Sequence, residues 1–383
     1  MPNPFDSLSK QKKTGAFKKL WKPITALLSN VPTLISNGYR PLQMTFEDQL
    51  KALVFFHLEE HTSGTHLVQF LEKDDFAREC IAPKDGIKKS SFFEAINSRG
   101  LEQLNHVFNK LQEQAAATLP QKFTPLGELV AIDGSLIDAV LSMTWADYRD
   151  GAKKAKIHLG FNINRSIPTK LFLTDGLASE RHYVRHLLAS DQTGVLDRGY
   201  QSHDLFDQWQ EQDIKFICRI KTTTIKTIIK HNPCKSESIV FYDAIVLLGT
   251  PGLNQTTKPI RLVGYRIGSV NYWVATNRLD LTAEDIALAY RLRWEIEKFF
   301  AWWKRHLKVY HLIARSEYGL MVQILSGLIT YLLLASYCHE NYNERVSIKR
   351  VRELRIQIQN EARHTECVKP QWKNVRNYFA AKT

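Results

Sequence analysis

The spacing of apolar residues divides the chain into a helical first third and a mixed α/β segment after it. Between residues 46 and 60 the apolar side chains recur at helical spacing, and 66–71 and 101–117 have the same character. A further helix is expected to begin at Ser90, whose hydroxyl can cap the first turn. Residues 1–125 are therefore predicted to be all-α, either as a DNA-binding domain or as an ordinary helical bundle.

Beyond Pro120 and Pro125 the pattern changes to short β-type runs that alternate with helices, which is typical of an α/β sheet. Helices are expected near 179–188 and 202–212. A Thr-, Ile- and Val-rich stretch with turn residues predicts a β-rich insertion from about residue 222. The predicted strands of the sheet itself are 129–132, 156–162, 170–174, 194–196 and 215–220.

One apolar run, residues 319–338, is long enough to span a bilayer, which requires about 20 residues. Four polar residues dilute it, Gln323, Ser326, Thr330 and Ser336, and the sequence offers no second span. A buried core helix is therefore predicted. The five cysteines are far apart and form no C-x-x-C pair, and the N-terminus has no secretory signal pattern. We expect a soluble, cytoplasmic protein without a membrane partner.

The charge of the chain is concentrated at its two ends. The 383 residues include 52 Lys and Arg against 39 Asp and Glu, a net charge of +13. Residues 1–40 hold seven basic residues and one acid, and 341–383 hold ten basic residues and four acids. Basic ends on a nearly neutral body favour a polyanionic partner such as nucleic acid. A solubilising charge or a membrane-surface contact is the alternative.

Two aspartates, Asp133 and Asp197, each follow a predicted strand of the sheet. Strand ends are where ligand sites gather in α/β sheets, and Gly134 would allow close approach to the backbone. Hard divalent cations need converging carboxylate oxygens. Two strand-end carboxylates therefore predict a cation site, although a lone Asp at such a position is more often a turn or cap residue.

A third group of polar residues lies on the helix predicted from Thr282, whose hydroxyl can cap it, to His306. At about 100° per residue, its four members share an arc of roughly 60° and leave Glu295 on another side. Glu297 is thus the carboxylate that can join the two aspartates. A surface ion pair between Arg293 and Glu297 is the alternative interpretation. The four residues are Tyr290, Arg293, Glu297 and Lys304.

These residues carry a resemblance to a known family. The spacing Tyr-x2-Arg-x3-Glu-x6-Lys is similar to the signature of DDE transposases of the insertion-sequence-four type. Asp133 in Ile-Asp-Gly-Ser resembles their first catalytic aspartate. Asp197 in Leu-Asp-Arg-Gly-Tyr resembles the second, and Glu297 matches the third acid. The resemblance covers about residues 127–335.

The resemblance implies a ribonuclease H-like catalytic domain at 126–338, with the β-rich insertion at about 222–280. A helical DNA-binding domain would precede it at 1–125, and a basic tail would follow at 339–383. Two Mg²⁺ ions, for which Mn²⁺ can substitute, would be held by Asp133, Asp197 and Glu297. Such an enzyme cleaves DNA by phosphoryl transfer and joins 3′-hydroxyl ends to target DNA.

The same resemblance implies DNA contacts and partners. Arg293 and Lys304 would grip the phosphate backbone, and Tyr290 would hydrogen-bond a phosphate. Trp273 would stack on an unpaired base, although a Trp in a β-rich segment is more often a core residue. The expected partners are double-stranded DNA, as terminal inverted repeats and target, and a second copy of the chain in the complex. A nucleoid location follows. A nuclease of the same fold without strand transfer, and a non-catalytic DNA-binding protein, are the alternatives.

Overall fold

A computed structural model describes residues 15–35, 42–138, 143–149, 152–309 and 311–367. The chain forms two compact units. The domain boundaries drawn from the sequence stay a prediction, and the units differ from them because C-terminal residues group with the N-terminal helices. The first, the helical unit, comprises Met1–Leu111, His311–Ala314 and Val322–Thr383. The second, the sheet unit, comprises Gln112–Tyr310 and Arg315–Met321.

Capping side chains set where several helices of the helical unit begin. Thr45 and Asp48 form a capping box at the start of α2, and the Ser63 hydroxyl accepts the backbone N–H of His66 in the first turn of α3. Within the described residues 15–35 and 42–125 the secondary structure is helical, as expected, whereas the DNA-binding domain predicted at 1–125 stays a prediction. The helices that lie wholly in the unit's N-terminal part are α1 (Ala16–Leu27), η1 (Leu28–Asn30), α2 (Phe46–Leu58), α3 (Gly64–Lys73), α4 (Asp75–Cys80) and α5 (Lys89–Ser98); α6 (Leu101–Thr118) runs on into the sheet unit.

The predicted cap of α5 is wrong. The helix begins at Lys89, and its N-cap is Lys88, which makes no side-chain capping bond. Ser90 is exposed inside the first turn. The neighbouring Ser91 hydroxyl donates instead to the side chain of Gln43, at 2.8 Å. A hydroxyl caps a helix from the N-cap position, whose own backbone is extended, and Ser90 lies beyond that position as the second residue of the helix.

The predicted basic tail, 339–383, contains a helix in its described part. Helix α12 (Ile348–Cys367) packs against α1 and α4. The backbone N–H of Ala16 donates to both carboxylate oxygens of Glu361, at 2.7 and 2.9 Å, so this side chain caps α1. Arg355 is paired with Glu60 at 2.6 Å. Residues 368–383 of the predicted tail, like residues 1–14 of the basic N-terminus, lie outside the described residues.

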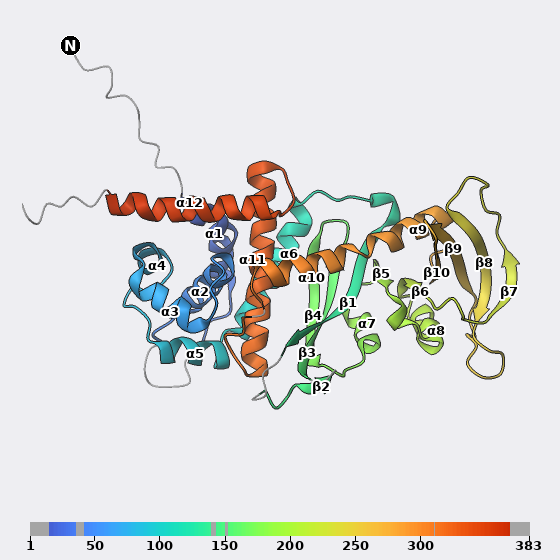
Figure 1. The fold of residues 1–383 in the computed structure, drawn as a ribbon, viewed down its shortest axis with the longest axis horizontal. Coiled ribbons are helices and arrows are strands. Elements are labelled where there is room, and N and C mark those ends of the chain that lie inside the picture. The colour runs from blue at the N-terminus through green and yellow to red at the C-terminus, as the bar shows by residue number, and fades with distance from the viewer. Residues whose placement is uncertain (1–14, 36–41, 139–142, 150–151, 310, 368–383) are drawn as a thin grey trace, which may run out of the picture. The chain divides into compact units, whose positions relative to one another are not determined.

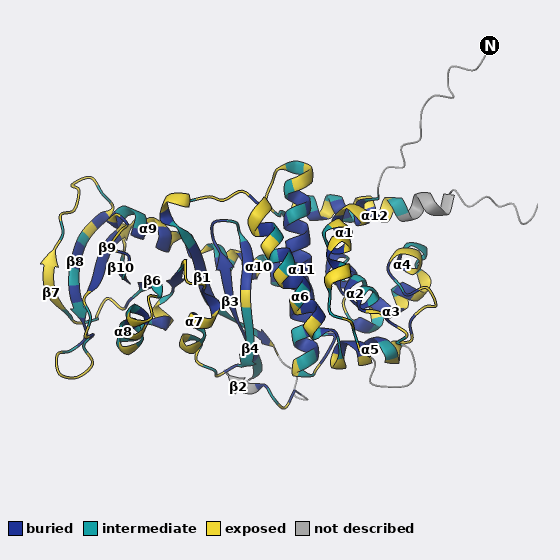
Figure 2. Cartoon of the chain, turned by 180° about the vertical axis from the view of Figure 1, so that it is seen from behind, coloured by how far each residue is buried: buried dark blue, intermediate teal, exposed yellow. Residues whose placement is uncertain are grey.

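Helix α11 (Glu317–Tyr342) is long and apolar enough to cross a membrane, and 89% of its most apolar 18-residue window is buried inside the protein. Three of its polar side chains, Gln323, Ser326 and Thr330, have no exposed surface, and Ser336 is half-buried. The hydroxyls of Ser326 and Thr330 donate to carbonyls one turn earlier, and Gln323 accepts from the Ile313 N–H at 2.8 Å. The predicted core helix is thus confirmed as a buried element, seen largely in dark blue in Figure 2.

The sheet unit is built on one ten-stranded mixed sheet (Figure 1). Strands β1, β5 and β6 are parallel, and the other pairings are antiparallel. The path of the sheet is β2-β3-β1-β5-β6-β10-β9-β8-β7, and β4 pairs with β3. The strands are β1 (Glu128–Asp138), β2 (Asp147–Arg149), β3 (Ala152–Asn162), β4 (Ile167–Asp175), β5 (Gln192–Leu196), β6 (Lys215–Arg219), β7 (Lys226–His231), β8 (Val240–Leu248), β9 (Ile260–Ile267) and β10 (Val270–Thr276).

Helices cover both faces of this sheet. Side chains of α7 (Val184–Leu187) and α8 (His203–Glu211) share a core cluster with Val130 and Ile132 of β1. The opposite face carries Phe161, which contacts Phe299 of α10 (Glu295–His306) at 4.9 Å between ring centroids. This three-layer arrangement fits the α/β fold expected for a ribonuclease H-like domain.

The predicted β-rich insertion extends the same sheet. Strand β10 pairs with β6 from Val274 to Thr276, and β9, β8 and β7 follow outward. After β10 the chain enters α9 (Ala283–Leu292) through a capping box between Thr282 and Asp285, which confirms the predicted cap. The outermost strand, β7, is almost entirely exposed and appears yellow in Figure 2.

The Glu361 cap of α1 leads to a stability prediction. Replacing Glu361 with Ala removes the carboxylate that accepts from the Ala16 N–H at the start of α1, and a lost cap costs about 1 kcal/mol. Urea unfolding of Glu361→Ala is expected to show a decrease in unfolding free energy of that size. Glu340→Ala, at an exposed position of α11, is the control and should stay within about 0.5 kcal/mol. Equal losses in both variants would contradict the capping role.

Candidate active site

Two aspartates lie side by side at the edge where β5 ends. Strand β1 pairs with β5 in parallel up to Ile132 and Leu196, so the next residues are Asp133 and Asp197. Neighbouring strands are about 4.8 Å apart. The sequence predicted that the first strand ends at Asp133, but β1 continues to Asp138 in its pairing with β3. Asp133 therefore has a strand backbone on one side and the end of β5 on the other.

Short-range hydrogen bonds hold both aspartates. The Gly134 N–H donates to Asp133 Oδ1 at 2.9 Å. Asp197 caps the short helix η4 (Arg198–Tyr200), and its Oδ1 accepts the N–H of Gly199. Both side chains are half-buried. The turn interpretation given to a lone strand-end aspartate thus applies to Asp197, which caps η4 and also lies next to Asp133.

The third predicted acid, Glu297, lies on α10. The helix predicted from Thr282 to His306 is interrupted, because α9 ends at Leu292 and α10 begins at Glu295. The connecting turn has tighter bonds, such as Arg293 N–H to Tyr290 O at 3.1 Å. The Arg293 guanidinium pairs with Glu297 Oε1 at 2.5 Å. The ion pair considered as an alternative is therefore present, with Arg293 only 9% exposed rather than on the surface.

The electrostatics bring Asp133, Glu297 and Arg293 together. Burial raises the pKa of Asp133 from 3.8 to about 7; the positive charge of Arg293 opposes this, and the negative charges of Glu297 and Glu180 add to it. Such a raised pKa means that Asp133 lacks solvation and has other acids nearby. A site of this kind is stabilised when a positive charge enters it.

The residues at this site fit a divalent cation. Within the described ranges, no three His, Cys, Asp or Glu side chains are grouped closely enough to hold a metal ion as they stand. Glu297 Oε2, however, is buried and has no hydrogen-bond partner among the described residues, while Oε1 is taken by Arg293. An unsatisfied carboxylate oxygen beside a buried aspartate matches the oxygen ligands that Mg²⁺ prefers.

The side chain of Lys304 makes a contact within the protein that the sequence did not predict. Its ammonium donates to the backbone carbonyl of Leu136 on β1, at 2.7 Å. Burial lowers its pKa, and the negative charges of Asp138 and Asp133 oppose that change. This bond fixes α10 to β1 beside Asp133, so Lys304 aligns the helix that carries Glu297. The phosphate contact predicted for Lys304 stays a prediction.

A cavity of about 370 Å³ opens next to Tyr290 and Arg293. Tyr265 and Tyr272 line it as a stacked pair, 5.2 Å between ring centroids, and the Arg219 guanidinium lies 4.9 Å from the Tyr272 ring. Flat rings beside guanidinium groups suit a flat, negatively charged ligand. We call this the tyrosine pocket.

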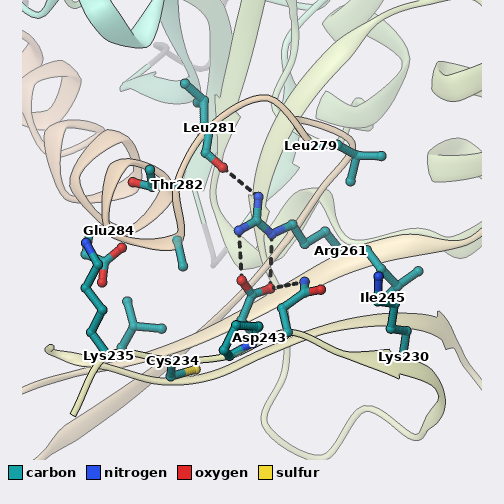
Figure 3. A pocket seen from close by; sticks show the side chains of 14 residues that line it. Lys230, Cys234, Lys235, Asp243, Ile245, Arg261, Leu279, Leu281, Thr282 and Glu284 are labelled. Carbon is teal, nitrogen blue, oxygen red and sulfur yellow. Dashed lines mark hydrogen bonds and ion pairs between the residues drawn. The ribbon is translucent and has the colours of Figure 1, made fainter.

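A second cavity of about 520 Å³ lies between the insertion strands and the start of α9 (Figure 3). The Arg261 guanidinium binds both carboxylate oxygens of Asp243, at 2.8 and 3.0 Å, and donates to Leu281 O at 2.6 Å. Both side chains are buried. Because these charges satisfy each other, the cluster supports the fold and anchors the segment that enters α9.

Comparison with known proteins identifies the family. The family model described as the transposase DDE domain matches residues 124–333.

The chain belongs to the DDE transposase domain family.

Individual relatives agree with this assignment and with the insertion-sequence-four type. The chain is 30% identical over 195 residues to a probable transposase for insertion sequence element IS5377 of Geobacillus stearothermophilus, covering 50% of this chain and 52% of that protein. It is 26% identical over 196 residues to y4zB of Sinorhizobium fredii, which is named as a transposase, covering 50% and 55%. A protein of Synechocystis named as a transposase for IS4SA is 23% identical over 256 residues, covering 64% and 70%. The chain thus spans about half the length of the first two relatives.

Trp273 does not lie with the other predicted DNA-contacting residues of this DDE domain. It is the neighbour of Tyr272 on β10, and successive strand residues point to opposite faces of a sheet. Tyr272 faces Tyr290, at 6.5 Å between ring centroids. Trp273 contacts Tyr242 instead, and the Lys226 ammonium lies 4.1 Å from its ring. The alternative, in which Trp273 packs within the insertion, describes its position better.

Three further features of the site were not recognised from the sequence. Glu180, in the short helix η3 (Glu180–Tyr183), lies beside Gly134, and no motif marked it. Tyr200 was visible only as the end of the Asp-Arg-Gly-Tyr run. Trp294 is 59% exposed in the break between α9 and α10 and lines the tyrosine pocket, and only the helix break brings it there.

The raised pKa of Asp133 predicts how stability depends on pH without a cation. An unfolded aspartate titrates near 3.8 and this one near 7, so the folded chain binds more protons in that window. Its stability therefore falls as the pH rises from about 4 to 7, and Asp133→Asn removes this loss. Urea unfolding in a chelating buffer should show the advantage of Asp133→Asn growing by about 3 kcal/mol between pH 4 and pH 8. If the difference in unfolding free energy between the two proteins did not change with pH, the ionised form of Asp133 would not be destabilised by burial.

Proposed function

We propose that this chain is the DNA transposase of an insertion sequence, which cleaves DNA at the element ends and joins the 3′-hydroxyl ends to target DNA. One observation carries the proposal. Asp133 and Asp197 follow the last register pair of β1 and β5, and the unsatisfied oxygen of Glu297 belongs to the helix that Lys304 ties to β1. The family match and the names of the relatives support the same reaction class.

In this proposal Asp133, Asp197 and Glu297 hold two divalent cations, with Mg²⁺ as the physiological ion and Mn²⁺ as a substitute. When bound, such ions activate the attacking oxygen and stabilise the leaving oxygen of an in-line phosphoryl transfer. Arg293 fixes one oxygen of Glu297 by an ion pair and leaves the other unsatisfied. Its guanidinium also lines the tyrosine pocket, so it lies between the acids and any DNA strand held there.

The tyrosine pocket is proposed as the place where the strand near the cut is held. The half-buried ring of Tyr272, which stacks on the fully buried ring of Tyr265, offers a surface for one unpaired base, and Arg219 and Arg291 offer charge to the adjoining phosphates. In place of Trp273, we assign the stacking role to Tyr272. Tyr290 lies between this pocket and Arg293, and its assignment to a phosphate contact is kept.

The helical unit is proposed to bind DNA through its backbone. Three lysines of α1, Lys18, Lys19 and Lys22, are exposed on one side of that helix, and three more, Lys84, Lys88 and Lys89, are exposed around the start of α5. Such contacts add affinity and salt dependence without reading sequence. A second copy of the chain is expected in the complex because two element ends must be joined. Association with the nucleoid follows from DNA binding.

The catalytic assignment predicts a sharp contrast between two glutamates of α10. Alanine at Asp133, Asp197 or Glu297 is expected to reduce end cleavage by about 1,000-fold or more, because the cation ligands are lost. Glu295→Ala is the comparison within α10, since Glu295 pairs with Lys298 at 2.8 Å on the wall of the tyrosine pocket and is not one of the proposed cation ligands. It should stay within about threefold, the effect of a surface ion pair of up to about 0.5 kcal/mol. Cleavage of a labelled element end would be measured for each variant. A separate filter-binding assay would measure its DNA affinity. Equal losses at Glu295 and Glu297 would contradict the assignment, and cleavage without joined product would favour a nuclease.

The pocket assignment predicts different effects at two adjacent residues. Tyr272→Ala is expected to slow cleavage by about tenfold, since stacking on one base contributes about 1–3 kcal/mol. Trp273→Ala should leave the cleavage rate constant of the protein–DNA complex nearly unchanged and mainly reduce the stability of the fold. Single-turnover cleavage and 2-aminopurine fluorescence at each position near the cut would be compared for both variants. Loss of the fluorescence change in Trp273→Ala but not in Tyr272→Ala would overturn the assignment.

A further inference from the structure

A fourth carboxylate, that of Glu180, lies against the backbone beside Asp133. A Cβ atom added to Gly134 would lie 2.6 Å from Glu180 Oε1 and 2.7 Å from its Cδ, which is closer than real Cβ atoms come. The absence of a side chain at Gly134 is therefore what allows this acid to approach β1. The Glu180 charge contributes to the raised pKa of Asp133, together with Glu297.

Glu180 is held in place from two directions. Its carboxylate is 3.2 Å from the ammonium of Lys156, whose side chain is only 5% exposed against 29% for Glu180. Lys156 in turn donates to Ala178 O at 2.9 Å. The next residue, Arg181, donates through Nε to Gly199 O at 2.9 Å and so ties η3 to the loop after Asp197. The two segments that carry Glu180 and Asp197 are thus fastened together.

The Tyr200 hydroxyl lies among these acids. Tyr200 is 1% exposed, and its hydroxyl makes no hydrogen bond of normal geometry with any described residue. Its pKa is raised by burial, then by the negative charges of Glu180 and Asp133, by a side-chain interaction with the Glu180 carboxylate, and by the charge of Asp197. Glu180 is therefore within reach of this buried hydroxyl as an acceptor, and a short movement of either side chain would complete the hydrogen bond.

We propose that Glu180 is a fourth acid of the active site, a positioning residue that, with the Tyr200 hydroxyl, supports cation binding by Asp133, Asp197 and Glu297. This rests on the proposed function above. Glu180 lies behind Asp133, across the Gly134 backbone, so it adds negative charge without occupying the side that faces α10. Tyr200 can donate to a carboxylate oxygen that the cation leaves free, which orients that carboxylate. The Lys156 pair keeps Glu180 from turning away.

The test is direct cation binding by the full-length chain without DNA, with Mn²⁺ followed by electron paramagnetic resonance. Glu180→Gln keeps the shape and an acceptor for Lys156 but removes the charge, and it should weaken Mn²⁺ affinity by roughly tenfold. Tyr200→Phe should weaken it by a smaller factor. Glu128→Gln is the matched control, because Glu128 is a 22% exposed glutamate paired with Arg165, five residues before Asp133 on β1. At about 3.3 Å per residue along the strand, Glu128 lies too far from Asp133 to influence the cation. The Mn²⁺ affinity of Glu128→Gln should therefore equal that of the unaltered chain.

Gly134→Ala tests the same contact from the other side. The new methyl group would displace the flexible end of Glu180, so this variant should weaken Mn²⁺ binding as Glu180→Gln does. If both act through one carboxylate, the double variant should bind no more weakly than Glu180→Gln alone. Additive losses would overturn the proposal. If Gly134→Ala fails to fold by circular dichroism, Glu180→Gln and Tyr200→Phe decide the question.

The outcomes separate this inference from the function on which it rests. Asp133→Asn should abolish Mn²⁺ binding whether or not Glu180 supports the cation site. If the unaltered chain binds Mn²⁺ and Glu180→Gln binds it equally well, Glu180 has only a structural role and the inference falls alone. If the unaltered chain binds no Mn²⁺ at all, both fall. At saturating Mn²⁺, Glu180→Gln should recover most of its cleavage rate, whereas Asp133→Asn should not.

Discussion

The parallel pairing of β1 with β5 is the constraint on which the active site depends. Five register pairs, from Glu128–Gln192 to Ile132–Leu196, bring Asp133 and Asp197 to the same position on neighbouring strands. A shift of one residue would turn one aspartate to the other face of the sheet. The register is fixed by apolar residues that have no exposed surface, such as Val130 and Ile132. The hydrophobic core therefore sets where the two aspartates lie on the sheet, and their own hydrogen bonds act only on neighbouring backbone.

This arrangement concentrates negative charge where solvation is poor. Arg293 offsets the charge of Glu297 and Lys156 offsets that of Glu180, but Oε2 of Glu297 is left without a hydrogen-bond partner among the described residues. Asp133 carries the consequence as a raised pKa. A divalent cation would relieve the repulsion among these groups, so the site is less stable alone than with its ligand. This is the expected relation between stability and function at a charged site.

The sequence predicted those parts of the fold that local pattern determines. The five strands of the sheet, the Thr282 cap and the placement of Asp133, Asp197 and Glu297 followed from alternation, capping chemistry and helical spacing. The break between α9 and α10 did not, because the run from Tyr290 to Glu297 contains no Gly or Pro and reads as one helix. The break is one tight turn, in which backbone N–H groups bond to the carbonyl three residues earlier. Arg293 and Glu297 therefore still lie on a common face, as predicted.

The errors concern residues whose position depends on distant partners. Trp273 was chosen by type, but the alternation of side chains along β10 assigns the face toward Tyr290 to Tyr272. Glu180 had no motif, since it reaches Asp133 only because β3 and β4 return the chain to the side of Gly134.

The placement of α9 also depends on distant partners, which lie in the β-rich insertion. Arg261 on β9 binds Asp243 of β8 and the carbonyl of Leu281, the residue before the cap of α9. An ion pair in the insertion therefore helps to hold the segment that enters α9, the helix that carries Tyr290 and leads into α10 with Glu297. A segment that looks like an addition to the catalytic fold thus helps to place the third acid.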